Sequence, residues 1–204
     1  MHKITIIDYG LGNLGSIYNM LRHIGIESQI TSNLTEIGNA DKLILPGVGS
    51  FDHGMKNLND GTLKEILNYK VKEQFTPILG ICLGMQLLGN SSEEGKEEGL
   101  KWINAVTKKF NFEDTSLKIP HMGWNYVSKT KDHPLLNDME NDTRFYFVHS
   151  YCVHCANKTD ELLSCHYGVD FTCAVLHDNI MGVQFHPEKS HRYGMQIFKN
   201  FAKL

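Results

Sequence analysis

Short apolar runs alternate with amphipathic segments through the first half of the chain. Four runs of aliphatic and β-branched residues have the length and composition of buried strands, at residues 3–7, 27–31, 43–45 and 77–81. Between the first two runs, apolar residues recur every three or four positions, as in a helix that is capped by Asn13 and stops at Gly25. This alternation predicts an α/β fold, with a mostly parallel central sheet flanked by helices on both faces.

The pattern changes after about residue 90. Residues 91–99 are polar, acidic and contain glycine, which predicts a surface loop. Beyond them come three short strand candidates, at residues 145–151, 173–176 and 180–184. These indicate an antiparallel C-terminal extension that returns to the sheet, followed by an amphipathic helix over residues 193–204. Because the chain contains no repeat, low-complexity segment or linker, we expect a single domain over residues 1–204.

The composition is that of a soluble globular protein, with 41% hydrophobic and 21% charged residues. The formal net charge is −3, so no global basic field indicates a nucleic-acid or anionic membrane partner. No apolar run approaches the length of a membrane span, and the start of the chain lacks the apolar run of a signal peptide. We therefore expect a cytoplasmic protein that binds neither nucleic acid nor membrane.

Five cysteines form an odd set, which in a chain without an export signal indicates thiols rather than disulfides. One of them, Cys82, lies in the motif G-I-C-L-G at residues 80–84, between a strand candidate and an apolar helix. This is the arrangement of a nucleophile elbow, in which glycines let the reactive atom stand clear of the backbone. The N–H of Leu83 would then face an oxyanion formed on attack. Taken alone, the motif fits a buried structural cysteine equally well.

A possible base and its orienting group follow late in the chain. His186 and Glu188 flank Pro187 at the end of a strand candidate. Proline favours an extended conformation at the residue before it, and in an extended segment residues i and i+2 project to the same side. A cysteine nucleophile needs such a base, held in one tautomer by a third group. A lone His–carboxylate pair is more often a surface hydrogen bond, but together with the elbow it predicts a catalytic triad of Cys82, His186 and Glu188.

These motifs are similar to those of class I glutamine amidotransferases, and the chain more closely resembles the glutaminase subunits of imidazole glycerol phosphate synthases. The closer resemblance rests on four motifs: I-D-Y-G-L-G-N at residues 7–13, L-P-G-V-G-S-F at 45–51, P-H-M-G-W-N at 120–125 and F-V-H-S-Y at 147–151. The matches extend over almost the whole chain. They imply a flavodoxin-like amidotransferase fold.

The resemblance also implies a mechanism. The thiolate would attack the carboxamide of glutamine to give a γ-glutamyl thioester. His186 would protonate the leaving ammonia and then activate water, and Glu188 would orient His186. The oxyanion hole would combine backbone N–H groups of Leu83 and Gly49. The residues implied in glutamine binding are Gly47, Gln86, Ser150 and Tyr151. No cofactor or metal is implied.

Ammonia released into water would be protonated and lost as a nucleophile, so glutaminases of this kind dock on a synthase. The resemblance implies a (β/α)8-barrel cyclase subunit as the heterodimer partner, in histidine biosynthesis. The residues that match the segments facing this partner are His121, Met122, Trp124 and Lys189. Methionine and tryptophan are favoured at interfaces, although a core role would suit Trp124 nearly as well.

Two other motifs suggest different functions. G-L-G-N-L-G at residues 10–15 fits a dinucleotide fingerprint, but the second strand candidate ends without the acidic residue that would bind the ribose. Cys152, His154 and Cys155, with Cys165 nearby, are of metal-ligand types but lack a second tightly spaced pair. We assign neither NAD binding nor a metal or redox site.

The acceptor of the ammonia remains open. Residues 99–106 lack the further glycines and the proline usual in the histidine-pathway subunit, and residues 166–172 and 190–195 look more like paralogues from surface-polysaccharide gene sets. Those paralogues are thought to supply ammonia to an amidotransferase that acts on a nucleotide sugar, with the same triad and a different acceptor. A docking module without activity is a third hypothesis, against which the intact triad argues.

Overall fold

The parallel half of the sheet forms where the apolar runs predict it. The computed structural model describes residues 3–112 and 117–204. Five adjacent strands run parallel, in the spatial order β2 (Ser28–Thr31), β1 (Ile4–Ile7), β3 (Lys42–Leu45), β4 (Ile78–Ile81) and β12 (Ile180–Val183). All residues of β1, β3, β4 and β12 are buried, because both faces of the sheet are covered. This is why these strands are continuous apolar runs rather than alternating ones.

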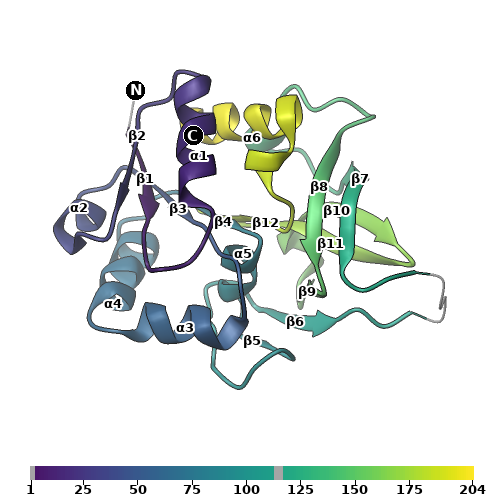
Figure 1. The fold of residues 1–204 in the computed structure, drawn as a ribbon, viewed down its shortest axis with the longest axis horizontal. Helices are drawn as coiled ribbons and strands as arrows, with labels where there is room; N and C mark the ends of the chain where they lie inside the picture. The colour runs from purple at the N-terminus through teal and green to yellow at the C-terminus, as the bar shows by residue number, and fades with distance from the viewer. Residues whose placement is uncertain (1–2, 113–116) are drawn as a thin grey trace.

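Helices cover both faces of this sheet (Figure 1). On one face lie α1 (Leu14–His23) and α6 (His191–Lys203). On the other lie α2 (Leu34–Gly38), α3 (Phe51–Asn59), α4 (Leu63–Asn68) with a π-helical turn at Tyr69–Glu73, and α5 (Leu83–Leu87). In β3, Ile44 packs in the core cluster under α1 and α6, whereas Leu43 and Leu45 pack in the cluster under the other helices. The predicted α/β class is confirmed.

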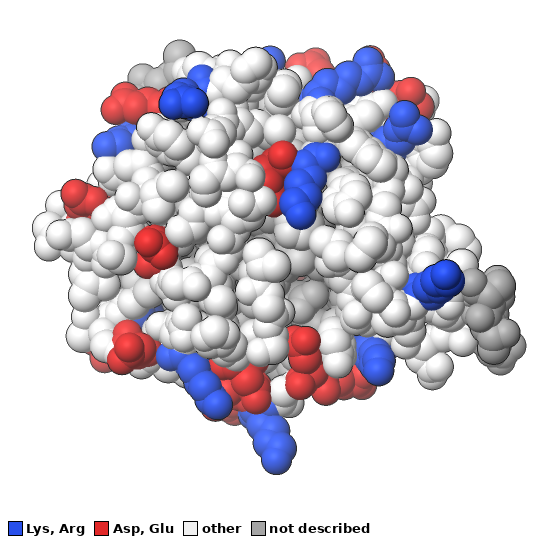
Figure 2. All heavy atoms as spheres, viewed as in Figure 1, with Lys and Arg blue, Asp and Glu red and all other residues white. Residues whose placement is uncertain are grey.

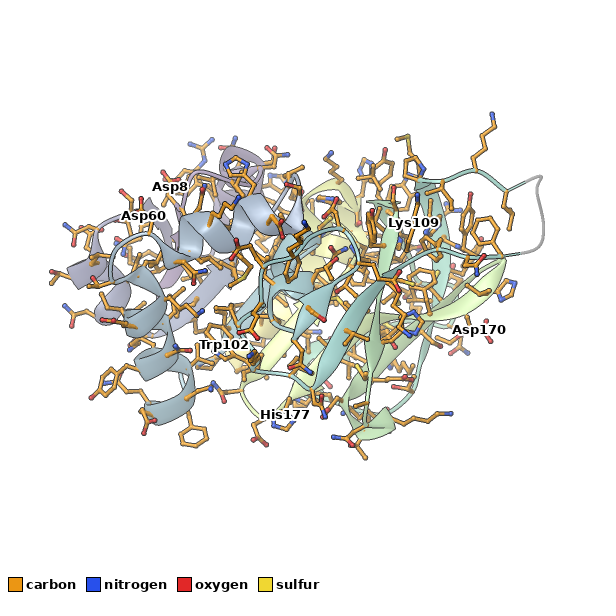
Figure 3. All side chains as sticks on the ribbon, turned by 90° about the horizontal axis from the view of Figure 1, so that it is seen from below. Asp8, Asp60, Trp102, Lys109, Asp170 and His177 are labelled. Atoms are coloured by element: carbon orange, nitrogen blue, oxygen red, sulfur yellow. The ribbon has the colours of Figure 1, made fainter. Side chains whose placement is uncertain are left out.

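An antiparallel extension continues the sheet from β12 (Figure 1). Its strands follow in the order β11 (Val169–His177), β10 (Glu161–Tyr167), β7 (His121–Lys129) and β8 (Arg144–His149). Beside them, β9 (Tyr151–Cys155) pairs with β11 and with β6 (Ala105–Lys109), which also pairs with the short β5 (Ser91–Ser92). Single 3₁₀ turns occur at Pro134–Leu136, Lys158–Asp160 and Pro187–Lys189. The predicted antiparallel extension is confirmed. In Figure 3, Asp8 and Asp60 mark the helix-covered half, and Lys109 and Asp170 the antiparallel half.

Strand β12 joins the two halves, because it is parallel to β4 and antiparallel to β11. The carboxyl ends of β3, β4 and β12 therefore lie at one edge of the sheet. The loop that starts at Pro46, the nucleophile candidate Cys82 and the segment with His186 follow these three ends. In open α/β sheets this edge is where ligands bind.

The outer surface carries charges of both signs. On the face drawn in Figure 2, basic and acidic side chains are interspersed, and much of the surface between them is uncharged. This mixture agrees with the small net charge. Within the described ranges, no helix combines the length and apolar character needed to cross a membrane.

Candidate active site

Cys82 occupies a strained turn between β4 and α5. Its backbone has φ +55° and ψ −109°, outside the regions that residues other than glycine normally adopt. Such a conformation costs about 1–3 kcal/mol and persists only where the surroundings impose it. The Cys82 N–H donates to the carbonyl of Val183 in β12 (2.8 Å), and the Cys82 carbonyl accepts the N–H groups of Met85 and Gln86. The turn has the geometry expected of a nucleophile elbow.

Two glycines let the start of α5 lie directly on the loop that follows β3. A Cβ atom on Gly84 would lie 1.9 Å from the carbonyl oxygen of Leu45, and one on Gly47 would lie 2.6 Å from the Gly84 nitrogen. Both distances are far below normal van der Waals contact. The close packing fixes the first N–H groups of α5, Leu83 among them, relative to residues 46–49. These are the two segments expected to form the oxyanion hole.

His186 and Glu188 meet at the carboxyl end of β12. His186 Nδ1 and Glu188 Oε1 are 2.8 Å apart, and the two side chains are only 4% and 1% exposed. The segment between them is a 3₁₀ turn at Pro187–Lys189, not the extended segment that the sequence argument assumed. Because a carboxylate can only accept, Nδ1 of His186 donates and Nε2 faces away from Glu188.

A buried serine ties the backbone of His186 to β8. The Ser190 hydroxyl donates to the His186 carbonyl (2.7 Å) and accepts the N–H of Tyr146 (3.0 Å). The His186 N–H in turn donates to the Tyr146 carbonyl (2.9 Å). Sequence reasoning missed Ser190, which has no catalytic chemistry of its own. Its effect is to hold the imidazole in place through the main chain.

The charges around His186 favour a protonated imidazole beside the sulfur of Cys82. His186 Nε2 and Glu188 Oε2 are buried and make no hydrogen bond within the described residues. Burial alone lowers the pKa of His186, but its interactions with Cys82 and Glu188 outweigh burial and raise that pKa well above its ordinary value. Tyr9 donates its hydroxyl to the Pro46 carbonyl (2.6 Å), and burial together with the charge of Cys82 raises the pKa of Tyr9. Tyr9 therefore anchors the loop after β3 as a neutral donor.

A pocket of about 270 Å³ opens beside Cys82, close to the lower end of the range for small-molecule sites. The expected site residues that line it are Gly49, Cys82, Leu83, Gln86, Ser150, Tyr151 and His186. The fold thus brings one nucleophile candidate, one base candidate and the expected binding segments to a single small cavity. Two expected residues lie behind it, Gly47 against the start of α5 and Glu188 behind His186.

Gln184 is a site residue that sequence reasoning missed. It is fully buried, and its Nε2 lies 3.7 Å from Cys82 Sγ. Its Oε1 accepts a hydrogen bond from Nε2 of Gln86 (3.0 Å). Gln184 stands two residues before His186 at the same strand end. This i, i+2 spacing could have indicated from the sequence that both side chains project toward the site.

Glu94 also lines the pocket, although it comes from the polar stretch that we read as a surface loop. Its Oε2 accepts the N–H of Phe51 at the start of α3 (2.8 Å), which holds the carboxylate at the pocket edge. Nearby, Asp52 accepts the N–H groups of Lys96 and Glu97 and ties the stretch to α3. Nothing in the local sequence distinguishes Glu94 from the other acidic residues of this stretch.

Two buried histidines form a pair at the pocket, of which His149 lines the cavity and His121 lies behind it. His121 Nδ1 lies 3.0 Å from His149 Nε2, and His149 Nδ1 lies 2.8 Å from the carbonyl oxygen of Tyr151. Their residues are 3% and 6% exposed. Burial lowers the pKa of His121 to about 4 and that of His149 to about 3. Both rings are therefore neutral at neutral pH.

This pair should make the fold sensitive to acid. Because both pKa values are depressed, the unfolded chain takes up protons below about pH 6.5 that the folded chain does not, so stability is lost as the pH falls from there toward 4. Each histidine contributes about 1.4 kcal/mol per pH unit to this loss. His186, with a raised pKa, stays protonated in the folded chain over this range, so it does not add to the loss; it opposes the loss slightly near pH 6.5, until the unfolded chain is protonated as well.

His149→Asn should therefore reduce the pH dependence of the unfolding free energy by about 1.4 kcal/mol per pH unit, measured in urea between pH 6 and pH 5. The variant is compared with wild-type protein at each pH, so that the carboxylates common to both cancel. An unchanged slope would contradict the assignment of a neutral His149.

The outer face of β7 carries exposed apolar side chains. Met122, Trp124 and Tyr126 alternate outward, at 62%, 42% and 56% exposure. Lys189 is also exposed, with its Nζ 5.7 Å from the ring of Tyr146. His121 differs from the expectation, because the same alternation turns its side chain inward. Its ring is not available as a surface contact for a partner.

The four remaining cysteines have thiols that are much harder to ionise than an ordinary cysteine. Burial raises the pKa of Cys152, Cys155 and Cys165 each to about 12, and it also raises that of Cys173 well above its ordinary value. Such thiols stay protonated and are poor nucleophiles and ligands. In residues 3–112 and 117–204, no group of three or more His, Cys, Asp or Glu side chains could hold a metal ion.

Comparison with known proteins agrees with this geometry. The family described as "Glutamine amidotransferase class-I" matches residues 5–204, so the chain belongs to this family. It is 56% identical over 200 residues to imidazole glycerol phosphate synthase subunit HisH 2 of Methanococcus maripaludis, covering 98% of each chain. It is also 49% identical over 201 residues to the protein of the same name from Pseudomonas aeruginosa, covering 98% of this chain and 99% of the other.

Solved structures support the fold at lower identity. A structure described as a glutamine amidotransferase superposes with a TM-score of 0.76 at 15% identity, covering 98% of this chain and 99% of that one. PurLQS from Thermotoga maritima gives 0.74 at 18% identity, covering 100% and 99%. At such identities the likeness concerns the fold alone.

Proposed function

We infer that this chain is the glutaminase subunit of an imidazole glycerol phosphate synthase, which hydrolyses glutamine to glutamate and ammonia and passes the ammonia to a cyclase subunit. The observation that carries this inference is the arrangement of Cys82, His186 and Glu188 at adjacent strand ends beside one small pocket. It is supported by full-length relatives at 49–56% identity that carry the name of this synthase subunit.

The geometry supports a two-step reaction. The Cys82 thiolate attacks the carboxamide carbon of glutamine and forms a C–S bond, and the oxyanion lies against the N–H groups of Leu83 and Gly49. His186 Nε2 gives its proton to the leaving nitrogen, the C–N bond breaks, and ammonia departs. His186 then takes a proton from water, which attacks the thioester and releases glutamate and the thiolate. Glu188 holds the ring in one tautomer and stabilises its charge whenever the ring is protonated.

Substrate binding follows from the charges at the pocket. The α-ammonium group of glutamine would pair with the Glu94 carboxylate, which the Phe51 N–H holds at the pocket edge. The backbone of Ser150 and Tyr151 would bind the α-carboxylate end, and Gln86 would contact the substrate from α5. Glu94 is thus added to the binding residues that the resemblance implied.

The released ammonia requires a docked acceptor enzyme. We propose that the exposed face formed by Met122, Trp124, Tyr126 and Lys189 binds the (β/α)8-barrel cyclase subunit. The exposed apolar side chains support this, because such a patch is costly on an isolated protein. We further propose a cytoplasmic location, where the five free cysteines stay reduced.

The test is a coupled assay of the purified chain with the cyclase subunit from the same organism. We expect glutamate release that rises when the cyclase is added, and transfer of ammonia to the ribulosyl-formimino carboxamide ribotide intermediate. Glutamate release without transfer to this intermediate, by a cyclase that is competent with free ammonium, would place the enzyme with the nucleotide-sugar paralogues. Absence of glutamate release under all conditions would refute the proposal.

A further inference from the structure

A continuous set of hydrogen bonds runs from β7 to the nucleophile, and its first half passes through the histidine pair. The Tyr151 carbonyl can only accept, so His149 Nδ1 carries the hydrogen and donates to it (2.8 Å). The neutral His149 must then accept at Nε2, so His121 Nδ1 donates (3.0 Å). His121 Nε2 is left to accept from the Asn125 amide (3.3 Å). Burial thus leaves each ring with one tautomer and one role.

The second half connects the same carbonyl to Cys82. The Tyr151 carbonyl also accepts from Gln86 Nε2 (3.4 Å), which donates in addition to Gln184 Oε1 (3.0 Å). Gln184 Nε2 then lies 3.7 Å from Cys82 Sγ. The Tyr151 carbonyl is therefore the point at which the histidine pair meets the residues that contact substrate and nucleophile.

The main chain bends at this point. Strand β8 ends at His149 and β9 begins at Tyr151, so Ser150 is a one-residue break between two strands that pair with different neighbours. The His149 ring reaches forward to the carbonyl two residues on and spans the bend. The Ser150 carbonyl is held from the other side by the Phe110 N–H (3.1 Å).

Aromatic packing holds the rings in place. His121 is stacked between Phe147 and Tyr167, with ring centroids at 4.9 Å and 4.1 Å. His149 packs against Phe110 and Phe171 at 5.1 Å and 5.2 Å. These contacts restrict the orientation of both rings.

We propose that His121 and His149 are positioning residues for glutamine, which fix the Tyr151 carbonyl and, through it, the Gln86 amide in the geometry that binds the substrate. The inference rests on the proposed glutaminase function and deepens it. Neither ring transfers a proton in the reaction. Their contribution should therefore appear in substrate binding rather than in the chemical step.

The experiment measures glutamine hydrolysis by the complex with the cyclase subunit. His149→Phe keeps a ring of similar size but removes both hydrogen bonds, and we expect KM for glutamine to rise about tenfold with kcat changed little, as for loss of a buried hydrogen bond. His149→Asn can still donate to the Tyr151 carbonyl through its amide and should recover part of the loss. His121→Phe should raise KM as well, because it leaves His149 Nε2 without its donor. His154→Phe, on the exposed side of β9, is the matched control and should leave KM unchanged.

A second readout separates glutamine binding from the chemical step. In a Cys82→Ala background, adding His149→Phe should weaken glutamine binding about tenfold by calorimetry, the same factor as in KM. A His149→Phe enzyme with a wild-type KM, or one whose kcat falls while KM and binding stay unchanged, would overturn the positioning role. A wild-type complex that releases no glutamate would refute the glutaminase proposal itself, whereas an active wild type with unaffected variants would refute the positioning role alone.

Discussion

Cys82→Ala is expected to abolish glutamine hydrolysis while the fold persists. The substitution removes the sulfur that forms the thioester, and what remains in the pocket can at most assist direct attack by water. We expect a loss of about 10⁴-fold or more in glutamate release with the cyclase subunit present. Alanine keeps the Cβ atom, so the turn with φ +55° retains its shape. The melting temperature should therefore change little.

The matched control is Cys155→Ala in β9, which removes a partly buried thiol outside the pocket. This variant should hydrolyse glutamine at the wild-type rate. A folded Cys82→Ala variant that retains wild-type activity would contradict the assignment of the nucleophile. Loss of activity in the control would show that thiol loss in general, rather than loss of Cys82, disturbs the enzyme.

Gly84→Ala is expected to destabilise the protein by about 3 kcal/mol, at the upper end for overpacked sites. The added methyl group would lie 1.9 Å from the Leu45 carbonyl oxygen, and this backbone atom cannot swing aside as a side chain would. Either α5 or the loop after β3 must shift. Such a shift would separate the N–H groups of Leu83 and Gly49, so kcat should fall as well. Urea unfolding and glutamate release measure the two effects.

Gly15→Ala provides the control for this prediction. Gly15 lies in the first turn of α1, and a Cβ atom there meets nothing within 4 Å. Alanine favours helix more than glycine does, so this variant should be stabilised by about 0.5–1 kcal/mol. Equal stabilities of Gly84→Ala and the wild type would contradict the close packing of α5 on the loop.

The sequence predicted those parts of the fold and site that depend on local pattern. The parallel strands were visible because β1, β3 and β4 are buried along their whole length and read as apolar runs. The elbow was visible because only particular residues tolerate its geometry. The contact between His186 and Glu188 was predicted, but the predicted backbone conformation was wrong. A 3₁₀ turn, not an extended segment, brings the two side chains together.

What could not be predicted depends on contacts between distant segments. Glu94 enters the pocket because it caps the N–H of Phe51, 43 positions earlier in the chain. The pair of His121 and His149 exists because β7 and β8 are in register at these positions. The same register turns His121 inward, and no local pattern distinguished it from the exposed Met122 beside it.

The central claim is that Cys82, activated by His186 and Glu188, is the nucleophile of a glutaminase. The most direct test is to incubate the protein with a glutamine analogue that alkylates thiols and to map the added mass on the cysteine peptides. We predict one label per chain, on Cys82, that glutamine protects against, with the other four thiols unmodified. A label on another cysteine, or equal labelling of all five that glutamine does not prevent, would contradict the claim.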